Sequence, residues 1–172
     1  MIKYYTSSIY ETALKQKKKV LTIYLITLAI YLLFCAGMLF WFSALTYKSN
    51  TVVTIKLIHY PVTLLYLIFS FVYIGIKYKR VNSFCKECFF LENGIKEESQ
   101  ATFFEYGETV QVKNGVDFKS LTFLEWNKYK KDYFERKVLV FHELPFPEFE
   151  QDEKYRFITQ GNVLIEYEKI ED

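Results

Sequence analysis

A stretch of 28 residues without a charged side chain, residues 20–47, constrains this chain more than any other feature. As a helix it would be about 42 Å long, whereas the hydrocarbon core of a bilayer is roughly 30 Å thick. A second uncharged stretch, residues 57–76, has 20 residues, enough for one span. A cleaved signal peptide has a shorter apolar stretch that ends in small residues, whereas residues 20–47 end in aromatic ones. The sequence therefore predicts two transmembrane helices joined by an extracytoplasmic loop, residues 48–56.

Cations flank the two predicted spans unequally. They stand before the first span and after the second, at Lys15, Lys17, Lys18, Lys19, Lys77, Lys79 and Arg80, whereas the loop holds only Lys48 and Lys56. The cytoplasmic ends of spans are enriched in Lys and Arg. We therefore expect a multi-pass protein of a bacterial cell membrane with both termini in the cytoplasm. The seven cations would form a collar that contacts lipid headgroups.

Small residues recur every seven positions in both spans. They are Thr22, Ala29, Ala36 and Ser43 in the first span and Thr63 and Ser70 in the second. Such stripes let helix backbones approach closely, so they predict packing between the two spans or against a second copy, as in a homodimer. Pro61 is expected in the first turn of the second helix, where its missing N–H is not needed. No Asp, Glu, Lys or Arg lies inside either span, which argues against a transporter.

The segments next to the spans have helical signals. Ser8 and Glu11 fit a capping box, so a cytoplasmic helix is expected within residues 1–19. The apolar spacing after the second span, ended by Asn93 and Gly94, predicts a cytoplasmic stalk helix over residues 77–94.

Cys85 and Cys88 form a CxxC pair in this predicted stalk. One such pair supplies half of a tetrahedral metal site, and neither a second pair nor a nearby His completes it. We interpret the two residues as small apolar side chains in a helix seam, and a metal site shared across a dimer is the alternative. No cofactor is expected.

From about residue 101 the pattern changes from helical to alternating. Hairpin turns are predicted at residues 113–115 and 160–162, with a further strand over residues 136–141. Pro145 and Pro147 place a loop between the strand over residues 136–141 and the hairpin around residues 160–162. About five short strands favour a small barrel or a sheet packed on a helix. The predicted fold class is membrane α+β, a two-helix transmembrane hairpin with a C-terminal β-rich cytoplasmic domain over residues 95–172.

Charge and motifs limit what this domain could do. Residues 97–172 carry 17 Asp and Glu against 10 Lys and Arg, so we expect no nucleic acid as a partner. No Walker loop, GxSxG or HExxH motif is present. His142 beside Glu143 could serve acid–base chemistry but is more often plain polar surface, so no catalytic residue is assigned.

Two segments, NGVDFKSLTFLEWN (residues 114–127) and QGNVLIEYE (residues 160–168), resemble a group of short, uncharacterised two-span membrane proteins of low-GC Gram-positive bacteria. The layout is also similar to that of NfeD-like proteins, whose soluble part is an OB-type barrel. The resemblance implies an OB-like barrel in the C-terminal domain and a scaffold or partner-binding role.

These features lead to three function hypotheses. The first is a non-enzymatic interaction or scaffold module, anchored in the lipid bilayer and presenting its β domain to a protein partner. The alternative is an accessory subunit of a larger membrane complex, in which the spans matter more than the domain. A membrane-bound enzyme of unknown type comes third.

Overall fold

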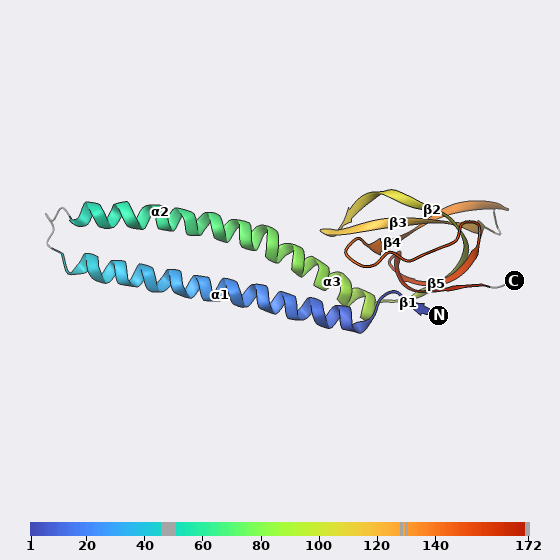
Figure 1. The fold of residues 1–172 in the computed structure, drawn as a ribbon, viewed down its shortest axis with the longest axis horizontal. Helices are drawn as coiled ribbons and strands as arrows, with labels where there is room; N and C mark the ends of the chain where they lie inside the picture. The colour runs from blue at the N-terminus through green and yellow to red at the C-terminus, as the bar shows by residue number, and fades with distance from the viewer. Residues whose placement is uncertain (46–50, 128, 130, 171–172) are drawn as a thin grey trace. The chain divides into compact units, whose positions relative to one another are not determined.

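The computed structural model describes residues 1–45, 51–127, 129 and 131–170, and the chain divides into two compact units. One unit is Lys15–Asn82, which is helical. The other joins Met1–Leu14 to Ser83–Asp172 and contains every strand of the described residues. The first residues of the chain therefore fold with its last half. Figure 1 shows the helices and the barrel.

The helices account for both uncharged stretches. Helix α1 is Ser7–Ser43, helix α2 is Thr51–Val72, and a π-helix, η1 (Tyr73–Tyr78), leads into helix α3 (Lys79–Asn93). Both α1 and the continuous helical stretch Thr51–Asn93 are long and apolar enough to cross a membrane. Only 6% of the residues in their most apolar windows are buried, unlike the core helix of a soluble protein. The prediction of two long apolar helices is confirmed.

The start of the second helix differs from the prediction. Helix α2 begins at Thr51, so residues 51–56 of the expected loop are helical, and residues 46–50 lie outside the described residues. The prediction that Pro61 lies in the first turn is wrong, because Pro61 is the eleventh residue of α2. Proline has no N–H, so the carbonyl of Leu57 lacks its usual partner four residues on.

Five strands close into a barrel. They are β2 (Glu97–Lys113), β3 (Val116–Asn127), β4 (Asp132–Phe141), β5 (Lys154–Gln160) and β6 (Val163–Lys169). The order is β2-β3-β4-β6-β5, and β5 pairs with β2 to complete the circle. All these pairs are antiparallel except β4 with β6, which are parallel and meet at Leu139 and Val163. Asn114 and Gly115 both have positive φ in the β2–β3 turn, as a tight hairpin requires. The predicted hairpins are confirmed.

Aromatic side chains fill the barrel. The buried interior consists of Ala101, Phe103, Leu121, Phe123, Val138, Val140, Phe149, Tyr155, Phe157 and Leu164. Phe149 comes from the β4–β5 loop. The centroid of its ring lies 5.2 Å from that of Phe103 and 4.7 Å from that of Tyr155. The loop that contains Pro145 and Pro147 thus contributes a core residue to the barrel.

A second cluster joins α3 and the N-terminal residues to the outside of the barrel. It consists of Tyr5, Ala13, Cys85, Cys88, Leu91, Val116, Phe118, Leu139, Phe141, Val163 and Ile165. Strand β1 (Ile2–Lys3) pairs with β6, and the backbone N–H groups of Tyr4 and Tyr5 both donate to the carbonyl of Ile165 at 2.9 Å. The sequence predicts only a helix within residues 1–19 and gives no signal for this two-residue strand.

Candidate functional site

Tyrosine side chains and Thr63 take part in the contact between the two helices of the hairpin. The rings of Tyr31 and Tyr66 stack with centroids 4.0 Å apart, and the Tyr31 hydroxyl donates to Thr63 Oγ1 at 3.1 Å. The Tyr73 hydroxyl donates to the carbonyl of Val20 at 3.2 Å. Hydrogen bonds between helices in lipid are worth about 0.6–2 kcal/mol each. The helical hairpin therefore has polar contacts of its own.

The predicted small-residue stripe divides between two faces. Thr63 and Ser70 are half-buried and share a face of α2 with Tyr66. The four small residues of α1 are exposed instead: Thr22, Ala29, Ala36 and Ser43. A side chain added at Gly37 would meet nothing within 4 Å. The α1 stripe therefore lies outside the contact between the two helices.

The predicted cation collar lies at one end of the helical unit. Lys15, Lys18, Lys19, Lys77, Lys79 and Arg80 are exposed and Lys17 is half-buried. The hydrogen bond between Tyr73 and Val20 holds the two helices side by side at the end nearest these cations. The Lys77 ammonium lies 5.2 Å from the centre of the Tyr73 ring. The seven cations are thus gathered where the two helices leave the apolar stretch.

Cys85 and Cys88 lie in the core of the barrel unit. They are free thiols with exposures of 4% and 0%, in the cluster that joins α3 to the barrel. Among the described residues, no group of three or more His, Cys, Asp or Glu is placed to hold a metal ion. Burial raises the pKa of the Cys88 thiol from about 9 to about 12. Such a thiol stays neutral near pH 7 and makes a poor metal ligand or nucleophile.

This pKa predicts that the barrel unit loses stability in alkali. Because the folded pKa is raised, the stabilisation is complete below about pH 9 and declines as the pH rises towards 12. One proton gives a slope of about 1.4 kcal/mol per pH unit. Denaturant unfolding between pH 8 and 10 should show a shallower decline for Cys88→Ala than for the Cys35→Ala control. Equal declines in the two variants would contradict the assignment.

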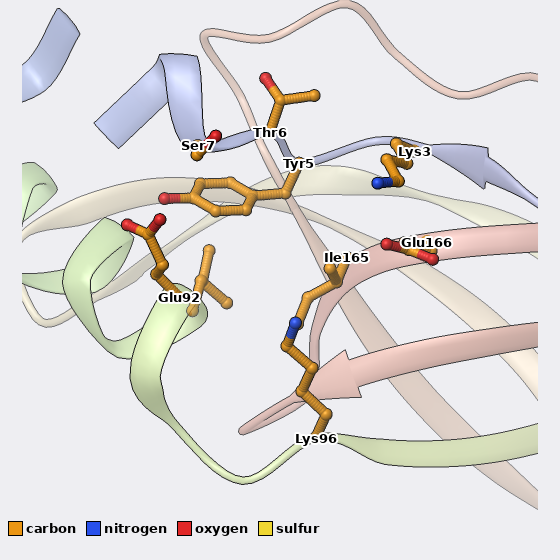
Figure 2. A pocket seen from close by; sticks show the side chains of 9 residues that line it. Lys3, Tyr5, Thr6, Ser7, Glu92, Lys96, Ile165 and Glu166 are labelled. Carbon is orange, nitrogen blue, oxygen red and sulfur yellow. The ribbon is translucent and has the colours of Figure 1, made fainter. Parts of the chain in front are cut away.

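One cleft of the barrel unit lies beside the N-terminal segment. It has a volume of about 360 Å³ and is lined by Lys3, Tyr5, Thr6, Ser7, Leu91, Glu92, Lys96, Ile165 and Glu166. Figure 2 shows Tyr5 across the middle, with Glu92 near its hydroxyl end and Lys96 extending towards Ile165. Lys3 and Glu166 oppose each other in the β1–β6 register, so their charges compensate. We interpret this cleft as the joint that attaches the N-terminal segment.

A shallower groove lies on the outer face of the barrel, where two strands separate. Thr102 opposes both Leu124 on β3 and Lys154 on β5, so the register between β2 and β3 ends at the residue where that between β2 and β5 also ends. The groove has a volume of about 270 Å³ and is lined by Gln100, Ala101, Thr102, Leu124, Trp126, Tyr133 and Lys154. We call this set the Trp126 groove.

The Trp126 groove combines exposed rings with polar groups. Trp126 and Tyr133 are 49% and 59% exposed, and their rings meet edge to face with centroids 4.9 Å apart. The amide of Gln100, the hydroxyl of Thr102 and the ammonium of Lys154 supply donors and an acceptor beside them. Exposed Trp and Tyr next to polar groups are typical of protein-binding surfaces. Neither ring was assigned to a site from the sequence.

Arg136 on β4 binds side chains of three other barrel strands. Its guanidinium donates to Ser99 Oγ at 2.5 Å and Thr159 Oγ1 at 3.2 Å. It also pairs with Glu125 at 3.2 Å and Glu97 at 3.5 Å, and its side chain is 16% exposed. Four side chains from three other strands thus hold one arginine, which has a structural role. His142, by contrast, is exposed at the end of β4.

Comparison with protein-family models, with curated proteins and with solved structures finds no match for this chain. The resemblance to NfeD-like proteins therefore stays a prediction.

Proposed function

We propose that this chain is an integral membrane protein that anchors a partner-binding barrel at the cytoplasmic face of the bilayer. One observation carries the proposal: Met1–Leu14 and Ser83–Asp172 fold as a single unit. Both ends of the helical hairpin therefore lead into the same domain, so they must lie on the same side of any membrane that the hairpin crosses. The bare apolar surface of the two helices supports lipid as their surroundings.

The orientation follows from the cation collar. Its seven Lys and Arg residues lie at the end of the hairpin that leads into the barrel unit. Cations at this density favour the cytoplasmic side and attract anionic headgroups. The domain itself has a net charge of −7 over residues 97–172, so we assign neither nucleic acid nor the lipid surface as its main partner.

We propose that the barrel is of the OB type. Its strand order, with β2 next to both β3 and β5 and with β4 parallel to β6, supports this assignment. In OB folds the face formed by the second and third strands commonly binds ligands. Here α3 covers one part of the corresponding face of β3 and β4 at Phe118 and Phe141. The other part carries Trp126 and Tyr133, so the Trp126 groove is our candidate surface for a protein partner.

A second candidate is an accessory subunit of a larger membrane complex, and the α1 stripe favours it. Thr22, Ala29, Ala36 and Ser43 are exposed rather than covered by α2. Small residues allow close packing of another membrane helix, which could belong to a second copy of this chain or to a different subunit.

The membrane topology can be tested with reporter fusions. Alkaline phosphatase, which is active only outside the cytoplasm, should be active when fused after Thr51 and inactive when fused after Asp172. A fluorescent protein fused after Asp172 should fluoresce, and the unfused chain should remain in membranes washed with alkaline carbonate. Active phosphatase at Asp172, or extraction by carbonate, would overturn the proposed function.

A further inference from the structure

The β2–β3 hairpin projects beyond the closed part of the barrel. Strand β2 pairs with β5 only from Glu97 to Thr102, whereas its pairing with β3 continues to Lys113 and Val116. Residues 110–113 of β2 therefore have no neighbouring strand on the side away from β3 among the described residues. The end of the hairpin is thus a two-stranded ribbon.

The polar residues of β2 in this ribbon face the protein. On β3, Val116 and Phe118 are buried against α3. Their partners on β2 are Lys113 and Gln111, and directly opposed side chains share one face of an antiparallel pair. The face of the ribbon that meets α3 therefore carries an amide and an ammonium from β2.

The apolar residues of β2 face the surroundings instead. Val110 and Val112 lie on the opposite face and are 46% and 71% exposed. On this face the ammonium of Lys119, which opposes Val110, lies 5.1 Å from the centre of the Phe146 ring, and that ring lies 5.2 Å from the Tyr106 ring. A sheet face in water normally carries polar residues, so this reversed alternation suits an interface. We call Tyr106, Val110, Val112 and Phe146 the hairpin stripe.

The hairpin turn is fixed next to the start of α3. Asn114 Nδ2 donates to Glu87 Oε1 at 2.6 Å. A Cβ added at Gly115 would lie 3.2 Å from Ser83 Oγ. Ser83 follows Arg80, the last cation of the collar, by three residues of the same helix, a rise of about 4.5 Å. The turn is therefore held a short distance from cations that would contact lipid headgroups.

Charge and tethering favour the bilayer as the occupant of the stripe. Residues 108–119 carry two Lys against one Glu and one Asp, whereas residues 97–172 have a net charge of −7. Anionic headgroups therefore do not repel this end of the domain. The membrane anchor also keeps lipid at a high effective concentration, so a contact too weak to recruit a protein from solution is still populated.

We propose that the hairpin stripe dips into the cytoplasmic leaflet, with Val110 and Val112 at the boundary between headgroups and acyl chains and the Lys119 ammonium at headgroup phosphates. This inference rests on the proposed function, to which it adds a second membrane contact. Strand β3 has 12 residues, so its other end, which carries Trp126, is about 40 Å away along the strand. The Trp126 groove then stays clear of lipid and open to a protein partner.

The test places a polarity-sensitive nitrobenzoxadiazole label on the full chain in nanodiscs of phosphatidylglycerol and phosphatidylcholine. Val112→Cys in a Cys35→Ala background supplies the thiol, since Cys85 and Cys88 are buried and unreactive. Lipids that carry a spin label in the headgroup region should quench this label. Its emission should lie at shorter wavelength than that of a water-exposed label.

Three matched variants define the contact. Tyr129→Cys should stay unquenched, because Tyr129 is 99% exposed and lies beyond the far end of β3. Gln111→Cys, one position from Val112 on the other face, should be quenched less. With the label at Val110→Cys, Val112→Asp should abolish quenching and Val112→Leu should keep it, because a carboxylate is repelled by anionic headgroups.

The other outcomes overturn the inference. An unquenched label at Val112→Cys does so, and it leaves the proposed function in place if the chain stays in carbonate-washed membranes. A label there that is blue-shifted but unquenched assigns the stripe to a protein surface, such as a second copy. Equal quenching at Val112→Cys and Tyr129→Cys shows a domain that lies on lipid without a preferred face. Should Val112→Asp fail to fold, the label on Val112→Cys decides the question.

Discussion

Deleting residues 1–5 is expected to unfold the barrel unit, although none of them belongs to the five barrel strands. The main loss is Tyr5, which is 6% exposed, lies in the outer core cluster and donates its hydroxyl to the Cys88 carbonyl at 3.0 Å. Truncating a buried aromatic residue costs about 3–5 kcal/mol, against a total stability of about 5–15 kcal/mol for a domain. Denaturant unfolding of the full chain in detergent, followed by Trp126 fluorescence in a Trp41→Phe background, measures the effect.

Single substitutions separate the contribution of the Tyr5 ring from that of its hydrogen bond. Tyr5→Ala should account for most of the loss, and Tyr5→Phe should cost only about 1 kcal/mol, because it removes one hydrogen bond and keeps the ring. Ile2→Ala is the matched control in the same segment, since Ile2 is 59% exposed. If the deletion and Ile2→Ala proved equally mild, the N-terminal segment would not be part of the core.

A rearranged chain provides the converse test. The Met1 amino group lies 3.2 Å from the Glu168 carboxylate, and Ile2 opposes Tyr167 in the β1–β6 pair. A short Gly and Ser linker from Asp172 to Met1 would therefore form a hairpin. A chain that starts at Ser83 and ends at Leu14 through this linker omits the helical unit, and it should be soluble and folded. Residues 83–172 alone should aggregate, because the surface that Tyr5 covers is exposed.

The sequence predicted those parts of the fold that have a strong local signal. The uncharged stretches mark α1 and α2, and Asn114-Gly115 marks the β2–β3 turn because both residues readily adopt positive φ. Strand β1 has two residues, which is too short for any periodicity, and its partner lies more than 160 positions away. For that reason the sequence did not predict that the N-terminal residues pair with the barrel.

The sequence also did not show which way the side chains of these elements point. Period seven identified small residues on both spans, but a span that is apolar all round gives no signal for the face that meets its neighbour. Tyr31 was the available signal, since a hydroxyl in an apolar stretch needs a partner, and Tyr31 finds one in Thr63. Trp126 and Tyr133 could not be paired before the β3–β4 register was known.

Replacing Arg136 with Ala is expected to destabilise the barrel unit by about 1–3 kcal/mol, as when buried or half-buried acceptors lose their hydrogen-bond donor. Alternation along β4 places Arg136 on the inner face with Val138 and Val140, where Glu125 and the fully buried Thr159 would lose their donor. Arg136→Met with Glu125→Gln should be milder than Arg136→Ala, because the half-buried carboxylate is neutralised together with its partner, and Glu97 is 67% exposed and stays solvated. Arg156→Ala is the matched control, since the Arg156–Glu98 pair is nearly half exposed and its loss should change the unfolding curve little. Equal unfolding curves for Arg136→Ala and Arg156→Ala would show that the contacts of Arg136 do not stabilise the barrel.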